Sequence, residues 1–322
     1  MADTLGFRIV GPCTNERRLV DWPTAFGGYA MLDARAEVNR EAYLSAFTFG
    51  ADFRQHLNAT GSTKGFDGVC GAEFIWFDID RADLEAARRD AAGLCLFLIE
   101  RYSLDDDGLL IFFSGSKGFH IGLPTALWQP TASGAFHLTA RRLAEALAAE
   151  CQVVIDAGVY DRVRAFRAPN SRHGKTGLHK RALTLRELTL LSIERIQELA
   201  REPMPFDVPT VSTRCELAVT DWHDAGQRVG RETEANRERR VLANGTACLN
   251  RSTLDFIREG AGAGDRHRLL FSAAANLAEL GCPVELAHEL LREAALNSGL
   301  PPNETKRQID CGWNHSKKGD RS

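Results

Sequence analysis

The sequence predicts an α+β protein in which a mixed domain of strands and helices is followed by a small all-helical domain. Two observations predict this class. From about residue 40 to residue 190, short apolar runs alternate with longer segments whose apolar residues recur at helical spacing. From Ser252 onward only the helical spacing remains. Such an order is typical of an α+β or α/β sandwich of sheets and helices.

The elements of the mixed domain follow from their local patterns. Short runs of aromatic and aliphatic residues predict strands. The first predicted helix has Asp83 and Glu85 in its first turn, where negative charge is favourable. In chain order the predicted elements are strands over 42–49 and 73–80, a helix over 82–102, strands over 109–114 and 118–124, a helix over 131–150, and strands over 152–156 and 181–185.

Three prolines between residues 201 and 213 end this pattern and predict an extended linker. A polar segment rich in Arg and Glu, over 215–245, then predicts a charged helix with little core. We therefore expect three parts: a mixed domain over 1–205, a charged connector over 206–245 and a helical domain over 246–322.

Composition sets the broad class. The 322 residues are 44% hydrophobic and 26% charged, as in globular proteins. No stretch approaches the ~20 apolar residues of a transmembrane helix, and the first residues do not resemble a signal peptide. We expect a cytoplasmic protein without a membrane partner. The eight cysteines form no Cys-x-x-Cys pair. Cys311 and His315 supply two of the four ligands that structural zinc needs, which favours ordinary surface residues there.

The net charge of −3 does not by itself indicate a nucleic-acid partner. Its distribution says more, because residues 162–181 hold seven cationic side chains and no acidic one. Such a block attracts phosphates. A solvated basic loop is the simpler interpretation of a charge run, so composition leaves the partner open.

Asp78 and Asp80 stand two residues apart at the end of a predicted strand. Residues at this spacing point to one face, so both carboxylates project together while Ile79 faces the core. Two like charges at close range are unfavourable unless a cation lies between them. Hard oxygen ligands at this spacing suit Mg²⁺ or Mn²⁺. The alternative is an acidic turn that caps the following helix.

A second cluster, Ser-Gly-Ser-Lys-Gly-Phe-His over 114–120, connects two predicted strands. Its glycines allow backbone N–H groups to approach a phosphate, its hydroxyls can donate, and its lysine adds positive charge. A plain hairpin with a satisfied histidine is the alternative. The candidate ligands to nucleotide phosphates are Ser114, Ser116, Lys117, Gly118 and His120.

The third cluster begins with Asp156, which ends the predicted strand 152–156. The loop that follows mixes guanidinium, amide, hydroxyl and imidazole groups. Arginines can clamp phosphates with two hydrogen bonds each, and the other polar groups can contact a ribose or a base. A hydrophilic loop is the alternative. The candidate residues are Arg164, Arg167, Asn170, Ser171, His173 and Lys175.

Together the clusters are more specific than any one alone. Two-metal phosphoryl transfer needs carboxylates on neighbouring strands and cations at the triphosphate. The order Asp-x-Asp, then 114–120, then an apolar run ending in Asp156 resembles the archaeo-eukaryotic primase superfamily. The similarity covers roughly residues 40–190 and is greatest to primase-polymerases of plasmids, phages and related mobile elements. The segment Arg-Ala-Pro-Asn-Ser-Arg-His-Gly-Lys-Thr-Gly over 167–177 also resembles theirs.

This resemblance implies a primase-like catalytic core, with an RNA-recognition-motif-like sheet and a second α/β module around a cleft. Asp78, Asp80 and Asp156 would be catalytic carboxylates that hold Mg²⁺ or Mn²⁺. Ser116 and His120, helped by Lys117, would hold the nucleotide phosphates. The helical domain would assist initiation. The implied partners are single-stranded DNA, nucleoside triphosphates and a replicative helicase, in trans or fused downstream; no helicase P-loop and no zinc-binding insertion is present in these residues.

The expected activity is therefore template-directed synthesis of short primers. Three alternatives remain open. A primer-dependent repair polymerase would share the same core. A replication initiator would bind DNA without turnover. A metal-dependent nuclease would use the same acids without nucleoside triphosphates.

Overall fold

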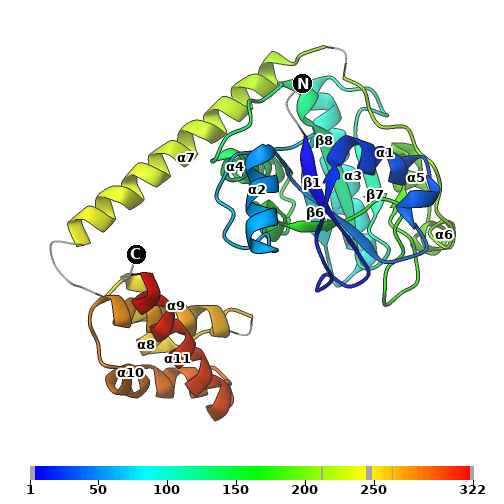
Figure 1. Ribbon diagram of the computed structural model, residues 1–322. Helices are drawn as coiled ribbons and strands as arrows, with labels where there is room; N and C mark the ends of the chain where they lie inside the picture. Colours follow the sequence, from blue (N-terminus) through cyan, green and yellow to red (C-terminus); the bar gives the residue numbers. More distant parts are fainter. Residues whose placement is uncertain (1–3, 212, 244–248, 263, 320–322) are drawn as a thin grey trace. The chain divides into compact units, whose positions relative to one another are not determined.

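The computed structural model describes residues 4–211, 213–243, 249–262 and 264–319. The chain divides into two compact units, Met1–Glu232 and Thr233–Ser322 (Figure 1). The division falls inside one long helix, α7 (Glu216–Ala243). The first unit is α+β with two antiparallel sheets, and the described part of the second is helical.

The first sheet is assembled from short strands that lie far apart in the sequence. Its strand order is β5-β4-β1-β3-β9, and β2 pairs with β1. The predicted strand over 42–49 is two strands, because the chain leaves the extended ladder at residues 46–47. The strands are β1 (Leu5–Val10), β2 (Arg18–Asp21), β3 (Ala42–Ser45), β4 (Thr48–Phe49), β5 (Cys70–Gly71) and β9 (Ala165–Arg167).

The second sheet has the order β10-β7-β8-β6 and confirms the predicted apolar strands. They are β6 (Phe74–Asp80), β7 (Leu110–Phe113), β8 (Gly118–Pro124) and the short β10 (Arg181–Ala182). The strand predicted over 152–156 is wrong. This segment begins in a turn, with Gln152 at a φ of 58°, and forms no ladder, although the Asp156 N–H donates to the carbonyl of Asp78 at 2.9 Å.

Helices α3 (Leu84–Tyr102) and α4 (Phe136–Glu150) pack against β6 and β8. The predicted helix over 82–102 is confirmed; Asp83 caps its N-terminus by accepting a hydrogen bond from Glu85 N–H. The helix predicted over 131–150 begins at Phe136. Smaller helices complete the unit: α1 (Trp22–Ala30), α2 (Ala51–Thr60), α5 (Leu185–Leu190) and α6 (Ile193–Leu199), with 3-10 turns η1 (Ala34–Ala36), η2 (Thr125–Leu127) and η3 (Ala157–Tyr160).

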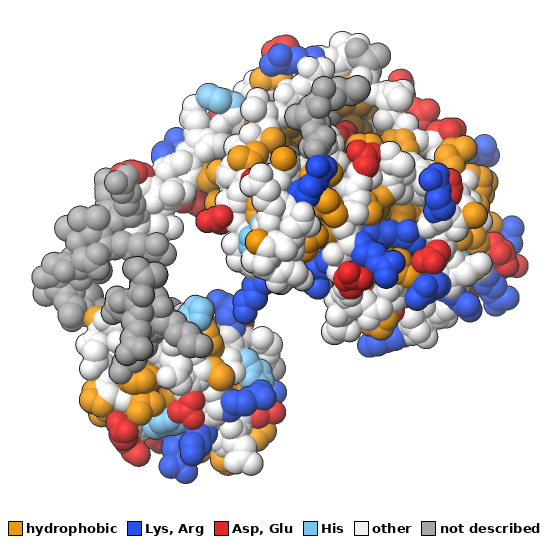
Figure 2. All heavy atoms as spheres, in the orientation of Figure 1, with side chains coloured by type: hydrophobic (Ala, Val, Ile, Leu, Met, Phe, Trp, Pro, Cys, Tyr) orange, Lys and Arg blue, Asp and Glu red, His pale blue; other side chains and the backbone are white. Residues whose placement is uncertain are grey.

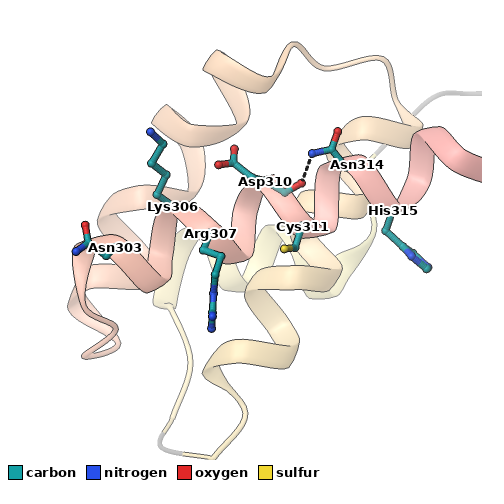
Figure 3. A pocket seen from close by; sticks show the side chains of 7 residues that line it. All are labelled: Asn303, Lys306, Arg307, Asp310, Cys311, Asn314 and His315. Carbon is teal, nitrogen blue, oxygen red and sulfur yellow. Dashed lines mark hydrogen bonds between the residues drawn. The ribbon is translucent and has the colours of Figure 1, made fainter.

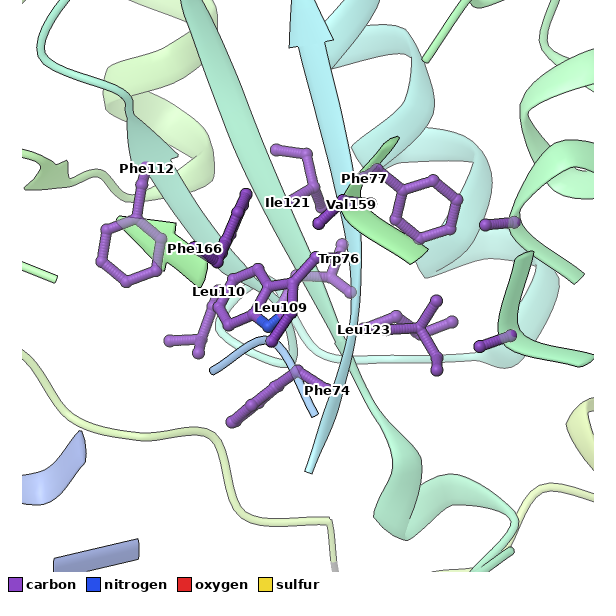
Figure 4. Close-up of a cluster of buried hydrophobic side chains, with 14 of the residues drawn as sticks. Phe74, Trp76, Phe77, Leu109, Leu110, Phe112, Ile121, Leu123, Val159 and Phe166 are labelled. Atoms are coloured by element: carbon purple, nitrogen blue, oxygen red, sulfur yellow. The ribbon is translucent and has the colours of Figure 1, made fainter. Parts of the chain in front are cut away.

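The core of the first unit lies on both faces of the second sheet (Figure 4). Phe77 and Trp76 of β6 point to opposite faces. Trp76 packs on Phe166 of β9, with ring centroids 5.3 Å apart. One face of the second sheet therefore meets β9, and the helices cover the other.

Helix α7 confirms the helix predicted over 215–245, and its first turns belong to the core of the first unit. Asp221 accepts hydrogen bonds from Arg101 at 2.8 and 2.9 Å and from the Tyr102 hydroxyl at 2.8 Å. Trp222 packs on Phe136, with ring centroids 4.9 Å apart. This part of the connector is therefore more than a solvated charged helix.

The second unit contains α8 (Arg251–Glu259), α9 (Arg266–Glu279), α10 (Val284–Asn297) and α11 (Pro302–Gly319). Its core includes Phe256, Leu270, Leu291 and Ile309. A hollow of about 510 Å³ lies along the polar face of α11, where Cys311 and His315 are exposed (Figure 3). Within the described ranges of the chain, no helix is both long enough and apolar enough to cross a membrane.

Candidate active site

Two carboxylates, Asp78 and Asp80, project from the end of β6 on the sheet face that meets β9. Ile79 between them takes the opposite face and is fully buried. The Asp78 side chain is 14% exposed and the Asp80 side chain is 33% exposed. The strand thus delivers two carboxylates to one partly open edge, as the sequence pattern predicts.

Asp156 reaches this edge from a distant part of the chain. Its backbone N–H donates to the carbonyl of Asp78, which fixes it beside β6. Its carboxylate caps the 3-10 turn η3 by accepting from Gly158 N–H at 2.8 Å. Burial, reinforced by the charges of Asp80 and Asp156, raises the pKa of Asp78 from its usual 3.8 to about 7. We call Asp78, Asp80 and Asp156 the acidic edge.

The turn between β7 and β8 lies against the acidic edge because a glycine permits it. Gly118 is paired with Asp80 across the sheet. A Cβ at position 118 would clash with the Ile79 carbonyl and the Asp80 carboxylate. Ser114 is buried and its hydroxyl accepts from the backbone N–H groups of Ser116 and Gly118, both at 3.3 Å. Ser114 therefore shapes the turn, while Ser116 remains partly exposed beside it.

His120 stands opposite Asp78 in the ladder between β6 and β8. Its Nε2 lies 3.5 Å from Asp78 Oδ1, which is too long for a firm hydrogen bond. The imidazole Nδ1 and Asp78 Oδ1 are both buried without a hydrogen-bond partner. Such orphaned groups are rare in folded proteins and are typical of a site that receives a ligand.

Burial sets the charge state of His120. Burial, together with the charges of Lys180 and Arg167, holds the pKa of His120 well below its usual range. The imidazole is therefore neutral near pH 7. It can offer a hydrogen bond to a phosphate oxygen but cannot neutralise its charge, so that role passes to the cationic side chains.

Lys117, at the tip of the turn, forms an ion pair with Asp80, with Nζ 3.0 Å from Oδ2. The lysine side chain is 68% exposed. Positive charge at the glycine turn therefore lies in direct contact with the acidic edge.

Arg164 and Arg167 lie on either side of Phe166 of β9. Arg167 donates to the Tyr43 hydroxyl at 3.4 Å and lies 3.8 Å from Glu41, yet its Nη1 is buried without a partner. Arg164 is exposed, and its charge lowers the pKa of Asp78. Arg164 therefore acts on the acidic edge, and Arg167 acts on His120 and keeps one donor without a partner.

Asn170 and Ser171, which the sequence predicts to contact a ribose or a base, are turned into the protein. Both are fully buried. The Asn170 amide donates to the carbonyls of Tyr29 and Met204, at 3.0 and 2.9 Å, and Ser171 donates to the carbonyls of Ala42 and Ala168. Asn170 thus ties the loop to α1 and to the segment after α6, and Ser171 ties it to β3. Residue type alone does not tell a ligand contact from an internal one.

His173 and Lys175 lie in the tight loop that follows. The Nδ1 atom of His173 accepts from the N–H groups of Lys175 and Thr176, at 3.1 and 3.3 Å, so it shapes the loop. The Lys175 side chain is exposed.

Lys180 is a site residue that the sequence interpretation missed. It is fully buried, and its Nζ lies 4.4 to 4.9 Å from the ring centroids of Trp76, Phe112 and Phe166. Its Nζ donates to the carbonyl of Arg167 at 2.9 Å; burial lowers the pKa of Lys180 well below its usual range, while a positive charge at this position lowers the pKa of Asp78. Cation–π contacts stabilise a desolvated ammonium. One indication of its position was its spacing from the strand that follows. Lys180 lies two residues before Ala182, which pairs with Phe112, and residues two apart along a strand share a face.

The basic block over 162–181 is not one continuous surface. Arg162 donates to main-chain carbonyls, and Lys180 and Arg181 are buried. On the face drawn in Figure 2, the Lys and Arg side chains of the first unit are interspersed with Asp and Glu. The block therefore presents its cations as separate groups and not as one continuous basic surface.

The donor chemistry of the acidic edge fits a hard divalent cation. Asp78 Oδ1 is buried and unpaired, and neighbouring carboxylates make its ionisation costly, which a cation would relieve. In the part of the chain that the structure describes, no group of three or more His, Cys, Asp or Glu side chains is arranged to hold a metal ion. Mg²⁺ commonly uses only one or two carboxylates and completes its shell with water and substrate phosphates.

Comparison with known proteins adds little. No protein-family model matches the sequence, and no curated protein matches it. A crystal structure of primase RepB′ aligns with 100% of this chain and 95% of its own, at 13% sequence identity and a TM-score of 0.37. That similarity is too low to support a functional inference, which must therefore come from the site itself.

Proposed function

We propose that this protein is a DNA-directed nucleotidyltransferase, a primase-polymerase of the archaeo-eukaryotic primase type that makes short primers on single-stranded DNA. One observation carries the proposal. Asp156 follows Asp80 by 76 positions in the sequence, yet it lies beside the Asp78/Asp80 pair. The pair lies next to a glycine turn with an exposed lysine. Acidic groups beside a cationic phosphate cradle are what phosphoryl transfer requires.

Asp78, Asp80 and Asp156 would hold Mg²⁺ or Mn²⁺ together with the triphosphate. When bound, such ions lower the pKa of an attacking hydroxyl and stabilise negative charge on the leaving phosphate. The protein's own contribution would be to hold the carboxylates on a rigid strand and to limit water around Asp78.

The surrounding groups would bind the incoming nucleotide. Lys117 would neutralise a phosphate oxygen, and neutral His120 would offer a hydrogen bond to one. Arg164 and Arg167 have free donors for the nucleotide or the template phosphates. Ser116 and the N–H groups of the glycine turn would add further donors.

The decisive test is synthesis without a primer. The protein is incubated with single-stranded DNA, labelled nucleotides and Mn²⁺ or Mg²⁺, beside Asp78→Ala and a matched control, Asp106→Ala, at an exposed acid before β7. We expect short labelled products from the wild type and the control and none from Asp78→Ala.

The other outcomes separate the competing functions. Products that require an added primer would indicate a repair polymerase. Degradation of DNA without nucleotides would indicate a nuclease. Salt-sensitive DNA binding without metal-dependent turnover would indicate an initiator. Normal synthesis by Asp78→Ala would remove the acidic edge from catalysis altogether.

A further inference from the structure

Two lysines act on the acidic edge, Lys117 by an ion pair with Asp80 and Lys180 through its charge near Asp78, and they differ in how firmly they are held. Lys180 is enclosed by three aromatic rings and is anchored by a hydrogen bond to the Arg167 carbonyl. The Lys117 side chain is 68% exposed and forms an ion pair with Asp80 at 3.0 Å. The first is part of the core, whereas the second is free to move.

The position of Lys117 is set by the glycine turn. The Ser114 hydroxyl binds the N–H groups on both sides of Lys117, those of Ser116 and Gly118. The absence of a side chain at Gly118 brings the turn against Asp80. The backbone therefore presents the lysine at the acidic edge, while its long side chain keeps its rotamer freedom.

We propose that Lys117 is an exchangeable counter-ion: it occupies Asp80 in the free protein and leaves when a divalent cation binds, which releases it to contact the triphosphate. This inference rests on the proposed function, because it assigns an order of events to the same site. The charges of Asp80 and Asp156 act against ionisation of Asp78, so the acidic edge favours a positive charge beside it, which the Lys117 ammonium supplies at Asp80.

The geometry favours exchange over a permanent structural ion pair. Asp80 is one third exposed and Lys117 two thirds exposed, and ion pairs at such positions contribute little to stability. The pair can therefore open at small cost.

The test measures Mn²⁺ binding to the full chain by calorimetry or by electron paramagnetic resonance, without nucleotide or DNA. The variants are Lys117→Gln and Asp80→Asn, and the matched control is Lys64→Gln, which removes the same charge from an exposed lysine in the loop after α2. We expect Lys117→Gln to bind Mn²⁺ roughly two- to fivefold more tightly than the wild type, because the substitution removes a competing ion pair at Asp80 and the free energy of a surface ion pair corresponds to a change in affinity of this size. Lys64→Gln should match the wild type, and Asp80→Asn should bind more weakly.

A second measurement adds a nonhydrolysable deoxynucleoside triphosphate at saturating Mn²⁺. Lys117→Gln should now bind this ligand several-fold more weakly than the wild type, so one substitution moves the two affinities in opposite directions. A lysine that only binds phosphate would change the second affinity alone, and a lysine that only braces the turn would change neither.

The possible failures are distinguishable. Equal Mn²⁺ affinity in Lys117→Gln and the wild type, with weakened binding in Asp80→Asn, would overturn the exchange and leave the metal site intact. An equal gain in Mn²⁺ affinity in Lys64→Gln would mean that the change in net charge alone causes the effect, and it would also overturn the exchange. Absence of Mn²⁺ binding in every protein, with or without the triphosphate, would overturn both the exchange and the proposed function.

Discussion

The two faces of the second sheet show how one set of strands can serve stability and chemistry at once. On the helix-covered face, Phe77, Ile79 and Phe119 are completely buried among apolar neighbours. On the other face, Asp78 and His120 stand at the same level of the same strands and keep buried polar atoms without partners. A protein tolerates such groups where a ligand completes them. The helix-covered face therefore stabilises the fold, and the face with Asp78 and His120 provides groups for ligand binding.

The largest expected effect is loss of activity when the polar face is altered. Asp78→Asn keeps the shape of the side chain but removes its charge and half of its metal-binding capacity. We expect primer synthesis to fall by at least ~10³-fold, which corresponds to roughly 4 kcal/mol of transition-state stabilisation. Initial rates at saturating Mn²⁺ measure it. A variant with more than a tenth of wild-type activity would show that the polar face does not carry the chemistry.

The second-largest expected effect is a loss of stability when the apolar face is altered. Phe119→Ala leaves a cavity between β8 and its neighbours, and substitutions of this kind cost about 3–5 kcal/mol. Leu96→Ala on α3, where the side chain is 52% exposed, is the matched control and should cost far less. Chemical denaturation of the full chain measures both. Equal losses would mean that burial on this face does not dominate the stability of the first unit.

The same Asp78→Asn variant should be more stable than the wild type at neutral pH without divalent cations. The pKa of Asp78 is about 7 in the folded protein and lies near 3.8 when unfolded, so ionisation opposes folding. The penalty is absent below pH ~4, grows as the pH rises, and is complete above pH ~7, where it reaches at most about 4 kcal/mol. Unfolding free energies at pH 5, 6.5 and 8 in EDTA measure the gap. A gap that shrinks as the pH rises would contradict this assignment.

The contrast between the two sheets also explains which strands could be predicted from the sequence. Strands β6, β7 and β8 are apolar runs of four to seven residues, and such runs are strong local signals. The strands β4 and β5 have two residues each, and long-range pairing creates them. The sequence interpretation did not place β1 or β2, because it identified no regular pattern before residue 40.

Prediction of the site divides in the same way. The direction of Asp78 and Asp80 followed from strand alternation, a local rule that the structure bears out for Ile79 between them. The burial of Asn170 and the position of Lys180 did not follow from the sequence, because each depends on distant neighbours: the backbone at Met204 for the first and the ring of Trp76 for the second. A pattern of residue types indicates which groups can bind a ligand, and only the fold decides which of them face it.

The smallest expected effect lies where the two faces meet, in the turn that carries Lys117. Ser114→Ala removes the acceptor for two backbone N–H groups, one of them at buried Gly118, and should cost about 1–2 kcal/mol of stability. The turn would then hold Lys117 less firmly, so we expect the KM for nucleotide to rise a few-fold while kcat changes little. Ser133→Ala, at an exposed serine before α4, is the control. A large loss in kcat with unchanged KM would instead place the Ser114 hydroxyl among the reacting groups, and the turn would no longer be a passive support.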